Sequence, residues 1–124
     1  MNRSAIYLSS KQVSHLTCEL EQRKFNITSV HDVSEALKLI SHHNIYAAVI
    51  IDAQDQPFLA LSFLKQAKRL CFMGAKIVII NEEDHDFIDN LYALGANDII
   101  HDQYHETNAA RIERLCHTFY NEAA

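Results

Sequence analysis

The chain has 124 residues, 48% of them hydrophobic and 22% charged, and its formal net charge at pH 7 is −5. This length and composition predict one globular domain that spans residues 1–124. The acidic balance argues against direct contact with nucleic acid, because neutralising phosphates needs a basic face. No apolar stretch approaches the roughly 20 residues of a membrane span, and the N-terminus lacks a signal-peptide core, so we expect a cytoplasmic protein without membrane contact.

Five short apolar or β-branched runs predict strands. In chain order they are Ala5–Leu8, Phe25–Val30, Tyr46–Ile51, Lys76–Ile80 and Asp98–Ile100. Within the third and fourth runs, Val49–Ile51 and Ile77–Ile80 are apolar without alternation, which is typical of strands covered on both faces. With only two glycines and one proline in the chain, we expect long elements joined by short connections.

A segment with helical spacing follows each predicted strand. The apolar stripes of these five segments are Val13, Leu16, Thr17 and Leu20; Val33, Ala36, Leu37 and Ile40; Leu61, Leu64, Ala67 and Cys71; Ile88, Leu91 and Tyr92; and Ile112, Leu115, Cys116 and Phe119. Asp32 and Glu35 form a capping-box pattern at the start of the second helix. Pro57 lies near the start of the third helix and Gly74 after its end, and Gly95 is expected to end the fourth helix as a left-handed cap.

The cysteines indicate a reducing environment. Cys18, Cys71 and Cys116 are widely spaced, odd in number and form no CxxC pair. This usage is typical of a cytosolic protein and argues against a disulfide framework, a metal site or redox chemistry. We expect all three to be reduced residues of the hydrophobic core.

The regular alternation of strands and helices predicts the fold class. It implies right-handed crossovers and a parallel sheet with helices on both faces. We therefore expect an α/β domain, a flavodoxin-like (βα)5 fold with strand order 2-1-3-4-5. In this order the first and third strands are neighbours at the switch point, which brings Ser9, Ser10 and Asp52 to one rim of the sheet.

Asp52 closes the apolar run of the third strand. Ligands and reactive groups collect at the carboxyl ends of strands in open α/β sheets. An acid at this place is either a reactive group or a residue that caps the strand end by hydrogen bonding. The residues expected around it decide between these readings.

A (βα)5 chain of this length with an Asp closing its third strand resembles the receiver domain of bacterial response regulators. The resemblance extends over essentially the whole chain. Leu61 and Leu64 follow Asp52 at the spacing of the third helix in that family. Residues 95–98, Gly-Ala-Asn-Asp, resemble the Gly-Ala-Asp-Asp that leads into the family's fifth strand.

The resemblance implies a set of functional positions, most of which are altered in this chain. An Asp at the position of Asp52 is the family's phosphoacceptor, and two acids after the first strand hold Mg²⁺. The acid pair falls here on Ser9 and Ser10. The hydroxyl residue that binds phosphate after the fourth strand falls on Asn81, and the Lys after the fifth strand falls on Asp102.

These departures argue against phosphorylation. Neutral hydroxyls replace carboxylates poorly around a hard cation, so we expect weak or absent Mg²⁺ binding and no cofactor. Asp102 places a negative charge where a positive one belongs, and a unit pair at about 4 Å is worth about 4 kcal/mol at an effective dielectric near 20. Ile99 occupies the position of the aromatic switch residue of the fifth strand. We therefore predict a pseudo-receiver: a degenerate, non-enzymatic signalling module that keeps the fold and acts by protein contacts.

Three readings of Asp52 and the strand ends stay open. We favour an exposed acid that is hydrogen-bonded to neighbouring amides or to the hydroxyls of Ser9 and Ser10. A second reading keeps Asp52 as a working phosphoacceptor with unusual metal chemistry. A third makes the strand-end crevice a small-molecule sensor site.

Other polar groups have plain interpretations that we favour over sharper ones. His101, Asp102 and His105 are candidates for a transition-metal site, but scattered surface histidines are the favoured reading. Ser9 and Ser10 are candidates for an anion site at a helix N-terminus, but helix capping is favoured because the loop has no glycine.

Partner predictions follow from the resemblance. Receivers pair through the face formed by the fourth helix, fifth strand and fifth helix, and we expect a homodimer through this face, where Phe87, Tyr92 and Tyr104 can leave apolar area. Residues 121–124 look like a domain end, so this chain is expected to be the N-terminal part of a longer regulator with an output domain, an expectation by analogy alone.

Overall fold

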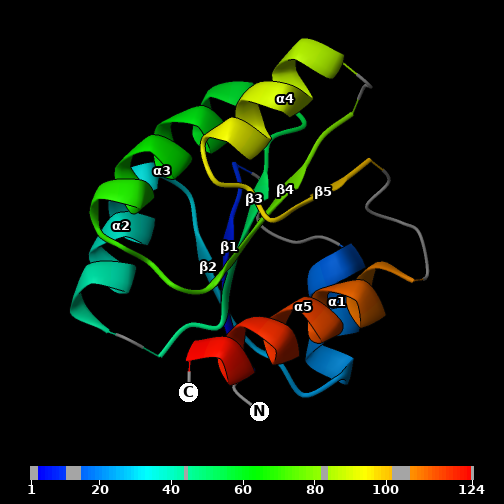
Figure 1. Cartoon of the computed structure of the whole chain (residues 1–124). Coiled ribbons are helices and arrows are strands. Elements are labelled where there is room, and N and C mark those ends of the chain that lie inside the picture. The colour runs from blue at the N-terminus through cyan, green and yellow to red at the C-terminus, as the bar shows by residue number, and fades with distance from the viewer. Residues whose placement is uncertain (1–2, 11–14, 44, 82–83, 102–106, 124) are drawn as a thin grey trace.

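The computed structural model describes residues 3–10, 15–43, 45–81, 84–101 and 107–123, the last five of these by their backbone alone. Strands and helices alternate along the chain (Figure 1). The strands are β1 (Ser4–Leu8), β2 (Asn26–Val30), β3 (Ala48–Asp52), β4 (Ala75–Ile79) and β5 (Asp98–Ile100). The helices are α1 (His15–Gln22), α2 (Val33–His42), α3 (Pro57–Arg69), α4 (His85–Ala93) and α5 (Asn108–Ala123). Strand boundaries shift by one or two residues from those predicted, and β5 matches its prediction.

The five strands form one parallel sheet in the order β2-β1-β3-β4-β5. The predicted fold class and strand order are therefore confirmed. β1 lies between β2 and β3, with Leu8 opposite Ile51 in the register of β1 and β3. This register places Ser9, the next residue of β1's chain, beside Asp52 at the end of β3.

Helices cover both faces of the sheet, as predicted (Figure 1). Alternate strand residues divide between two cores: Leu8 and Ile51 pack on the side of α2, α3 and α4, whereas Tyr7 and Ile50 pack on the side of α1 and α5. The central strand β3 is buried along its whole length, which explains its unbroken apolar sequence. Among the described residues, no helix combines the length and apolar character needed to cross a membrane.

Three of the predicted helix signals are confirmed. Asp32 caps α2, and its carboxylate accepts a hydrogen bond of 2.8 Å from the backbone N–H of Glu35. Pro57 is the first residue of α3, where its missing N–H costs no hydrogen bond. Gly95 has φ +109° beyond α4, and the N–H of Ala96 closes the turn on the carbonyl of Leu91 at 3.0 Å.

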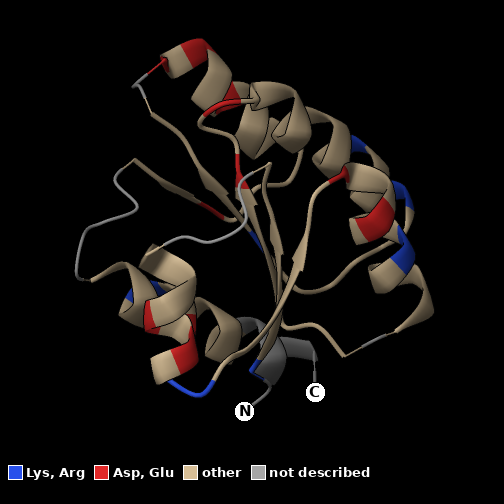
Figure 2. Ribbon diagram, turned by 180° about the vertical axis from the view of Figure 1, so that it is seen from behind, with Lys and Arg blue, Asp and Glu red and all other residues tan. Residues whose placement is uncertain are grey.

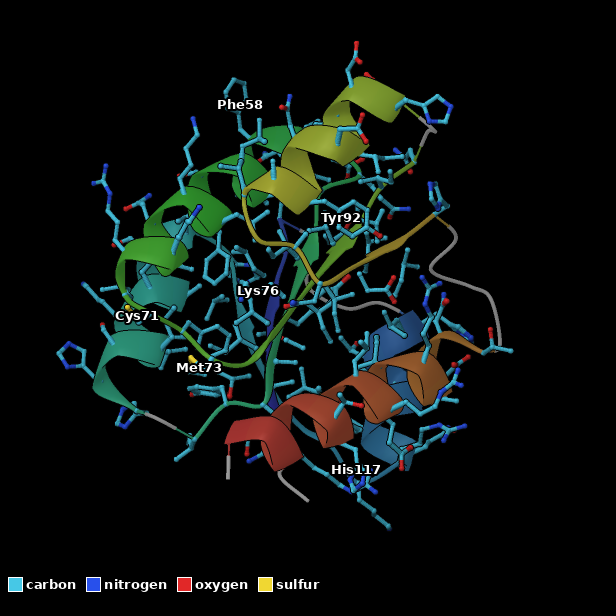
Figure 3. The ribbon with its side chains drawn as sticks, viewed as in Figure 1. Phe58, Cys71, Met73, Lys76, Tyr92 and His117 are labelled. Carbon is cyan, nitrogen blue, oxygen red and sulfur yellow. The ribbon has the colours of Figure 1, made fainter. Side chains whose placement is uncertain are left out.

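The end of α3 differs from the prediction. The helix stops at Arg69, and Cys71 takes the left-handed conformation with φ +55°, three residues before Gly74. Cys71 is therefore an exposed turn residue and not the last member of the buried stripe (Figure 3). Gly74 is needed for a different reason, because a Cβ there would lie 2.8 Å from the backbone oxygen of Ala47.

The prediction that all cysteines belong to the core is wrong for two of the three. Cys116 is buried, but Cys18 and Cys71 are exposed. Cys18 follows the buried Thr17 on α1 yet lies on the solvent side of that helix. Tyr92, predicted in the stripe of α4, is 48% exposed, because only Leu91 of that helix is fully buried.

Two predicted stripe positions fall outside the described residues. Val13 precedes the described start of α1, and the side chain of Phe119 lies in the part of α5 that is described by its backbone alone. The remaining positions of these two stripes are buried or half-buried as predicted.

Candidate functional site

Asp52 is the last residue of β3, and its backbone lies opposite Ile79 of β4. Residues two apart in a strand share a face, so its side chain follows that of Ile50 toward α1 and α5. Only 5% of Asp52 is exposed. The expectation of an exposed acid is therefore wrong, because the strand continues to Asp52 and buries it between neighbouring strands.

The carboxylate of Asp52 accepts hydrogen bonds on both oxygens. Its Oδ2 accepts from the hydroxyl of Tyr7 at 3.1 Å and from the hydroxyl of Ser9 at 3.3 Å. Its Oδ1 accepts from the backbone N–H of Gln54 at 3.1 Å. The predicted bonds to Ser9 and to a neighbouring amide are thus confirmed, whereas Ser10 is exposed and the described structure records no bond from it to Asp52.

Tyr7 is a member of this site that sequence reasoning missed. It is 1% exposed and lies two residues before Ser9, so the two side chains leave β1 on the same face. A buried tyrosine hydroxyl nearly always has a hydrogen-bond partner. A tyrosine inside the otherwise apolar run of the first strand was the signal that a polar partner lies on the neighbouring strand.

Asn81 joins the site at its outer edge. It follows β4, is exposed, and donates from Nδ2 to the backbone oxygen of Gln54 at 2.9 Å. On the other side, Nδ1 of His31 lies 3.1 Å from the backbone oxygen of Ser9. The segments that follow β1, β2, β3 and β4 are therefore linked to one another around Asp52.

Ile99 and Asp102 stand differently. Ile99 lies on β5, is 3% exposed, and packs in the core beneath α2, α3 and α4. Asp102 and His105 lie outside the described residues. The predicted contact of Asp102 with Asp52 and the candidate metal site of His101, Asp102 and His105 therefore remain predictions. Within the described part of the chain, no group of three or more His, Cys, Asp or Glu is placed to hold a metal ion.

A pocket of about 370 Å³ opens beside the site, between the loop after β3 and the start of α4. Its walls include Gln54, Pro57, Ile80, Asn81, Asp84 and Phe87. The pocket therefore combines an apolar side with the amide of Asn81 and a carboxylate that also caps α4.

No protein-family model matches the sequence, and a search of curated proteins finds no relative. Many solved structures are similar, and the receiver domain of a Francisella response regulator has a TM-score of 0.78 at 18% identity, over 99% of this chain and 100% of that one. The beryllofluoride-activated receiver-domain dimer of NtrC4, a protein of Aquifex aeolicus, has a TM-score of 0.81 at 15% identity over 94% of this chain and 98% of that one.

NtrX from Brucella abortus has a TM-score of 0.82 at 16% identity, and the match covers 99% of this chain but 28% of that one. The likeness to these structures shows that the chain has the fold of response-regulator receiver domains. The resemblance drawn from Asp52 and the strand pattern is confirmed at the level of the fold.

Proposed function

We propose that this chain is a receiver-like module of two-component signalling that acts through protein contacts without phosphorylation of Asp52. One observation carries the proposal: the Asp52 carboxylate is buried and accepts hydrogen bonds from Tyr7 and Ser9. In phosphorylated receivers, the position of Ser9 belongs to an acid that holds Mg²⁺. Here a hydroxyl stands in that place and donates to Asp52 itself.

Phosphoryl transfer would require a different arrangement. A carboxylate oxygen of Asp52 would have to lose its hydrogen bonds and form a bond to phosphorus while the donor's leaving group departs. Among the described residues, no Lys or Arg lies within 4 Å of that carboxylate to balance the added charge. Mg²⁺ demands near-octahedral oxygen ligation, usually with one or two carboxylates, and the hydroxyls of Ser9 and Ser10 are poor substitutes. Asp52 would be the one carboxylate of this donor set among the described residues, and both of its oxygens already accept hydrogen bonds, so we propose weak or absent Mg²⁺ binding and a non-catalytic domain.

We further propose a homodimer through the face formed by α4, β5 and α5. The exposed side of α4 carries Asp86, Asp89 and the half-exposed ring of Tyr92 (Figure 3). Arg111 and Arg114 lie on α5, with Arg111 paired to Asp98 of β5. A two-fold contact needs one self-complementary patch, and we propose that the carboxylates of α4 supply its negative charge and the exposed Arg114 of α5 its positive charge.

The structure does not place the other two aromatic residues predicted for this face on it. Phe87 lines the pocket beside α3 and is half-buried against the core, so its prediction as exposed apolar area on this face is wrong. Tyr104 lies outside the described residues. The proposed dimer therefore depends on charge and on Tyr92 more than on a broad apolar surface.

The proposal extends to the domain's context. NtrX matches this chain over 28% of its own length, an example of the same fold joined to further sequence. We propose that this module likewise works with an output domain or a separate protein partner. Its three free cysteines suit a reducing compartment, and we place its action in the cytoplasm.

A small-molecule sensor is the second candidate function. The pocket beside Asn81 and Phe87 has a volume of about 370 Å³, which lies within the range of ligand pockets. A bound ligand would raise the thermal midpoint by mass action, and Asn81→Ala should remove that shift. A ligand screen with no shift in the wild-type protein would count against this candidate.

Intact-mass spectrometry after incubation with acetyl phosphate and Mg²⁺ tests the main proposal. We expect no phosphoryl adduct under conditions that phosphorylate a receiver domain with both metal-binding acids. An adduct that appears on the wild-type chain and is absent from Asp52→Asn would contradict the proposal and favour a working phosphoacceptor.

A further inference from the structure

A groove runs between α2 and α3, which lie side by side on one face of the sheet (Figure 1). Its volume is about 440 Å³. Its lining includes Val33, Leu37, Lys38, Gln66, Arg69 and Leu70. The groove thus has an apolar floor from both helices and one cation on each wall.

The charges around this groove are mostly positive. α3 contains no acidic residue, and it exposes Lys65 and Lys68 in addition to Arg69. Neither these three side chains nor Lys38 has a carboxylate within 4 Å in the described part of the chain. The acidic residues of α2 are confined to its start, where Glu35 follows the cap.

Of the remaining described basic residues, three are paired, whereas Lys24, Lys76 and Arg114 also have no carboxylate within 4 Å in the described part of the chain. Arg3 and Arg23 share the carboxylate of Glu113, and Arg111 pairs with Asp98. Figure 2 shows blue segments gathered on the helices at its right-hand edge, on the side of α2 and α3, and red segments at the starts of α2 and α4. In a chain with net charge −5, four of the seven described Lys and Arg side chains that have no carboxylate within 4 Å therefore lie beside one groove.

The floor of the groove adds an apolar requirement. Leu70, at the end of α3, is 45% exposed and lines the groove together with the half-buried Val33 and Leu37. Met73, a little beyond, is 69% exposed (Figure 3). A ligand that covers this floor must bring apolar side chains as well as negative charge.

We infer that the α2–α3 groove binds an acidic amphipathic segment of a partner protein. A carboxylate that meets Arg69 can form a two-point contact, and Lys38 on the opposite wall supplies a second charged bond. Apolar side chains at helical spacing would cover Leu37 and Leu70, as in other helix-in-groove complexes. Nucleic acid would supply phosphates, but its bases bind best by stacking on aromatic rings, and the lining residues include none.

This inference rests on the proposed mode of action through protein contacts, and it names the chemistry of the partner. The groove is built from α2 and α3, so it remains free when α4, β5 and α5 form a dimer. Such a domain can form a homodimer through the face of α4, β5 and α5 and bind its partner protein in the α2–α3 groove.

The test uses the full chain and two short fluorescein-labelled helical peptides. One peptide has leucines at helical spacing with glutamates between them, and the other replaces every Glu by Gln. Fluorescence anisotropy measures their affinity for the wild type and for two double variants. Lys38→Gln with Arg69→Gln removes both groove cations, whereas Lys24→Gln with Arg114→Gln makes the same change in net charge at exposed positions outside α2 and α3.

We expect the Glu peptide to bind the wild type and to lose affinity by about tenfold or more in the groove variant, with about twofold or less in the control. Its amide shift changes should map to α2 and α3. Equal losses in both variants, equal binding of the Gln peptide, or displacement by a single-stranded DNA oligonucleotide at lower concentrations than by unlabelled Glu peptide would each overturn the inference. None of these results depends on Asp52. The phosphorylation assay therefore tests the proposed function independently of the groove.

Discussion

The hydroxyl of Tyr7 donates a hydrogen bond of 3.1 Å to Oδ2 of Asp52, joining β1 to β3 at the carboxyl end of the sheet. In this fold the same end of the sheet is where reactive groups collect. In this chain Tyr7 donates to the Asp52 carboxylate from within β1, and Ser9 donates to the same oxygen from just after the end of β1. We interpret Asp52 as a structural residue whose hydrogen bonds stabilise the pairing of β1 with β3.

Replacing Tyr7 tests this interpretation. Tyr7→Phe removes one buried hydrogen bond to a carboxyl group, so we expect the free energy of unfolding to fall by about 1–2 kcal/mol. Urea denaturation followed by circular dichroism measures the change, with an unchanged slope m. Tyr92→Phe is the matched control, since Tyr92 is half-exposed, and it should stay within about 0.5 kcal/mol. Equal effects of the two substitutions would show that the Tyr7 hydroxyl has no stabilising role.

The ion-pair cluster at the opposite end of the sheet predicts a pH dependence. Glu113 accepts from Arg3 and from Arg23 at 2.9 Å each, and these hydrogen bonds lower the pKa of Glu113 below its ordinary value of 4.5. A carboxyl whose pKa is lower in the folded state stabilises the fold above its unfolded pKa. That contribution disappears as the pH falls through the folded value.

Unfolding of the wild type and Glu113→Gln should therefore be compared between pH 7 and pH 3. We expect the wild type to be more stable at pH 7 and the difference to shrink below about pH 4.5. Glu21→Gln, on the exposed side of α1, should differ little from the wild type at either pH. A difference for Glu113→Gln that stays constant across this range would contradict the assigned ion pairs.

The three thiols should differ in reactivity. Burial raises the pKa of the Cys116 thiol to about 12, so almost no thiolate forms at neutral or mildly alkaline pH. Cys18 and Cys71 are exposed and accessible to reagents. Titration with Ellman's reagent at pH 8 should report two fast thiols in the native protein and a third on denaturation. Fast reaction of Cys116 in the native protein, identified with a Cys116→Ser variant, would contradict the position given to α5.

The proposed dimer predicts that opposite charge reversals compensate. Asp89→Lys and Arg114→Glu should each weaken self-association by about tenfold, because each sets like charges against one another. An equimolar mixture of the two variants should recover part of the lost affinity, as measured by sedimentation velocity at low salt. Glu21→Lys serves as a control on α1. Reversals that leave association unchanged would exclude this face.

The fold could be predicted from sequence because its signals are local and agree with one another. Apolar residues without alternation at Val49–Ile51 and Ile77–Ile80 indicated strands covered on both faces, and Asp32, Pro57 and Gly95 marked helix ends. Parallel order then followed from alternation. The end of α3 was less predictable, since Cys71 adopts a conformation that usually signals glycine.

The site was predictable only in part. Ser9 and Asp52 could be paired because the expected strand order makes their strands neighbours. Tyr7 was overlooked because an aromatic residue in a strand reads as core, and its hydroxyl acquires meaning only when Asp52 is known to be buried. The groove between Lys38 and Arg69 depends on how two helices pack, which periodicity within either helix does not reveal.

The most direct test of the central claim is the response of the Asp52 amide to beryllofluoride, a mimic of the phosphoryl group, in the presence of Mg²⁺. Two-dimensional ¹⁵N NMR spectra recorded with and without the reagent report on the amides of residues 52 and 54 and on the rest of β3. Because Tyr7 and Ser9 hold the carboxylate and no second acid accompanies it on β1, we predict unchanged spectra. A saturable shift of the Asp52 amide that requires Mg²⁺ and is lost in Asp52→Asn would contradict the account and restore Asp52 as a phosphoacceptor.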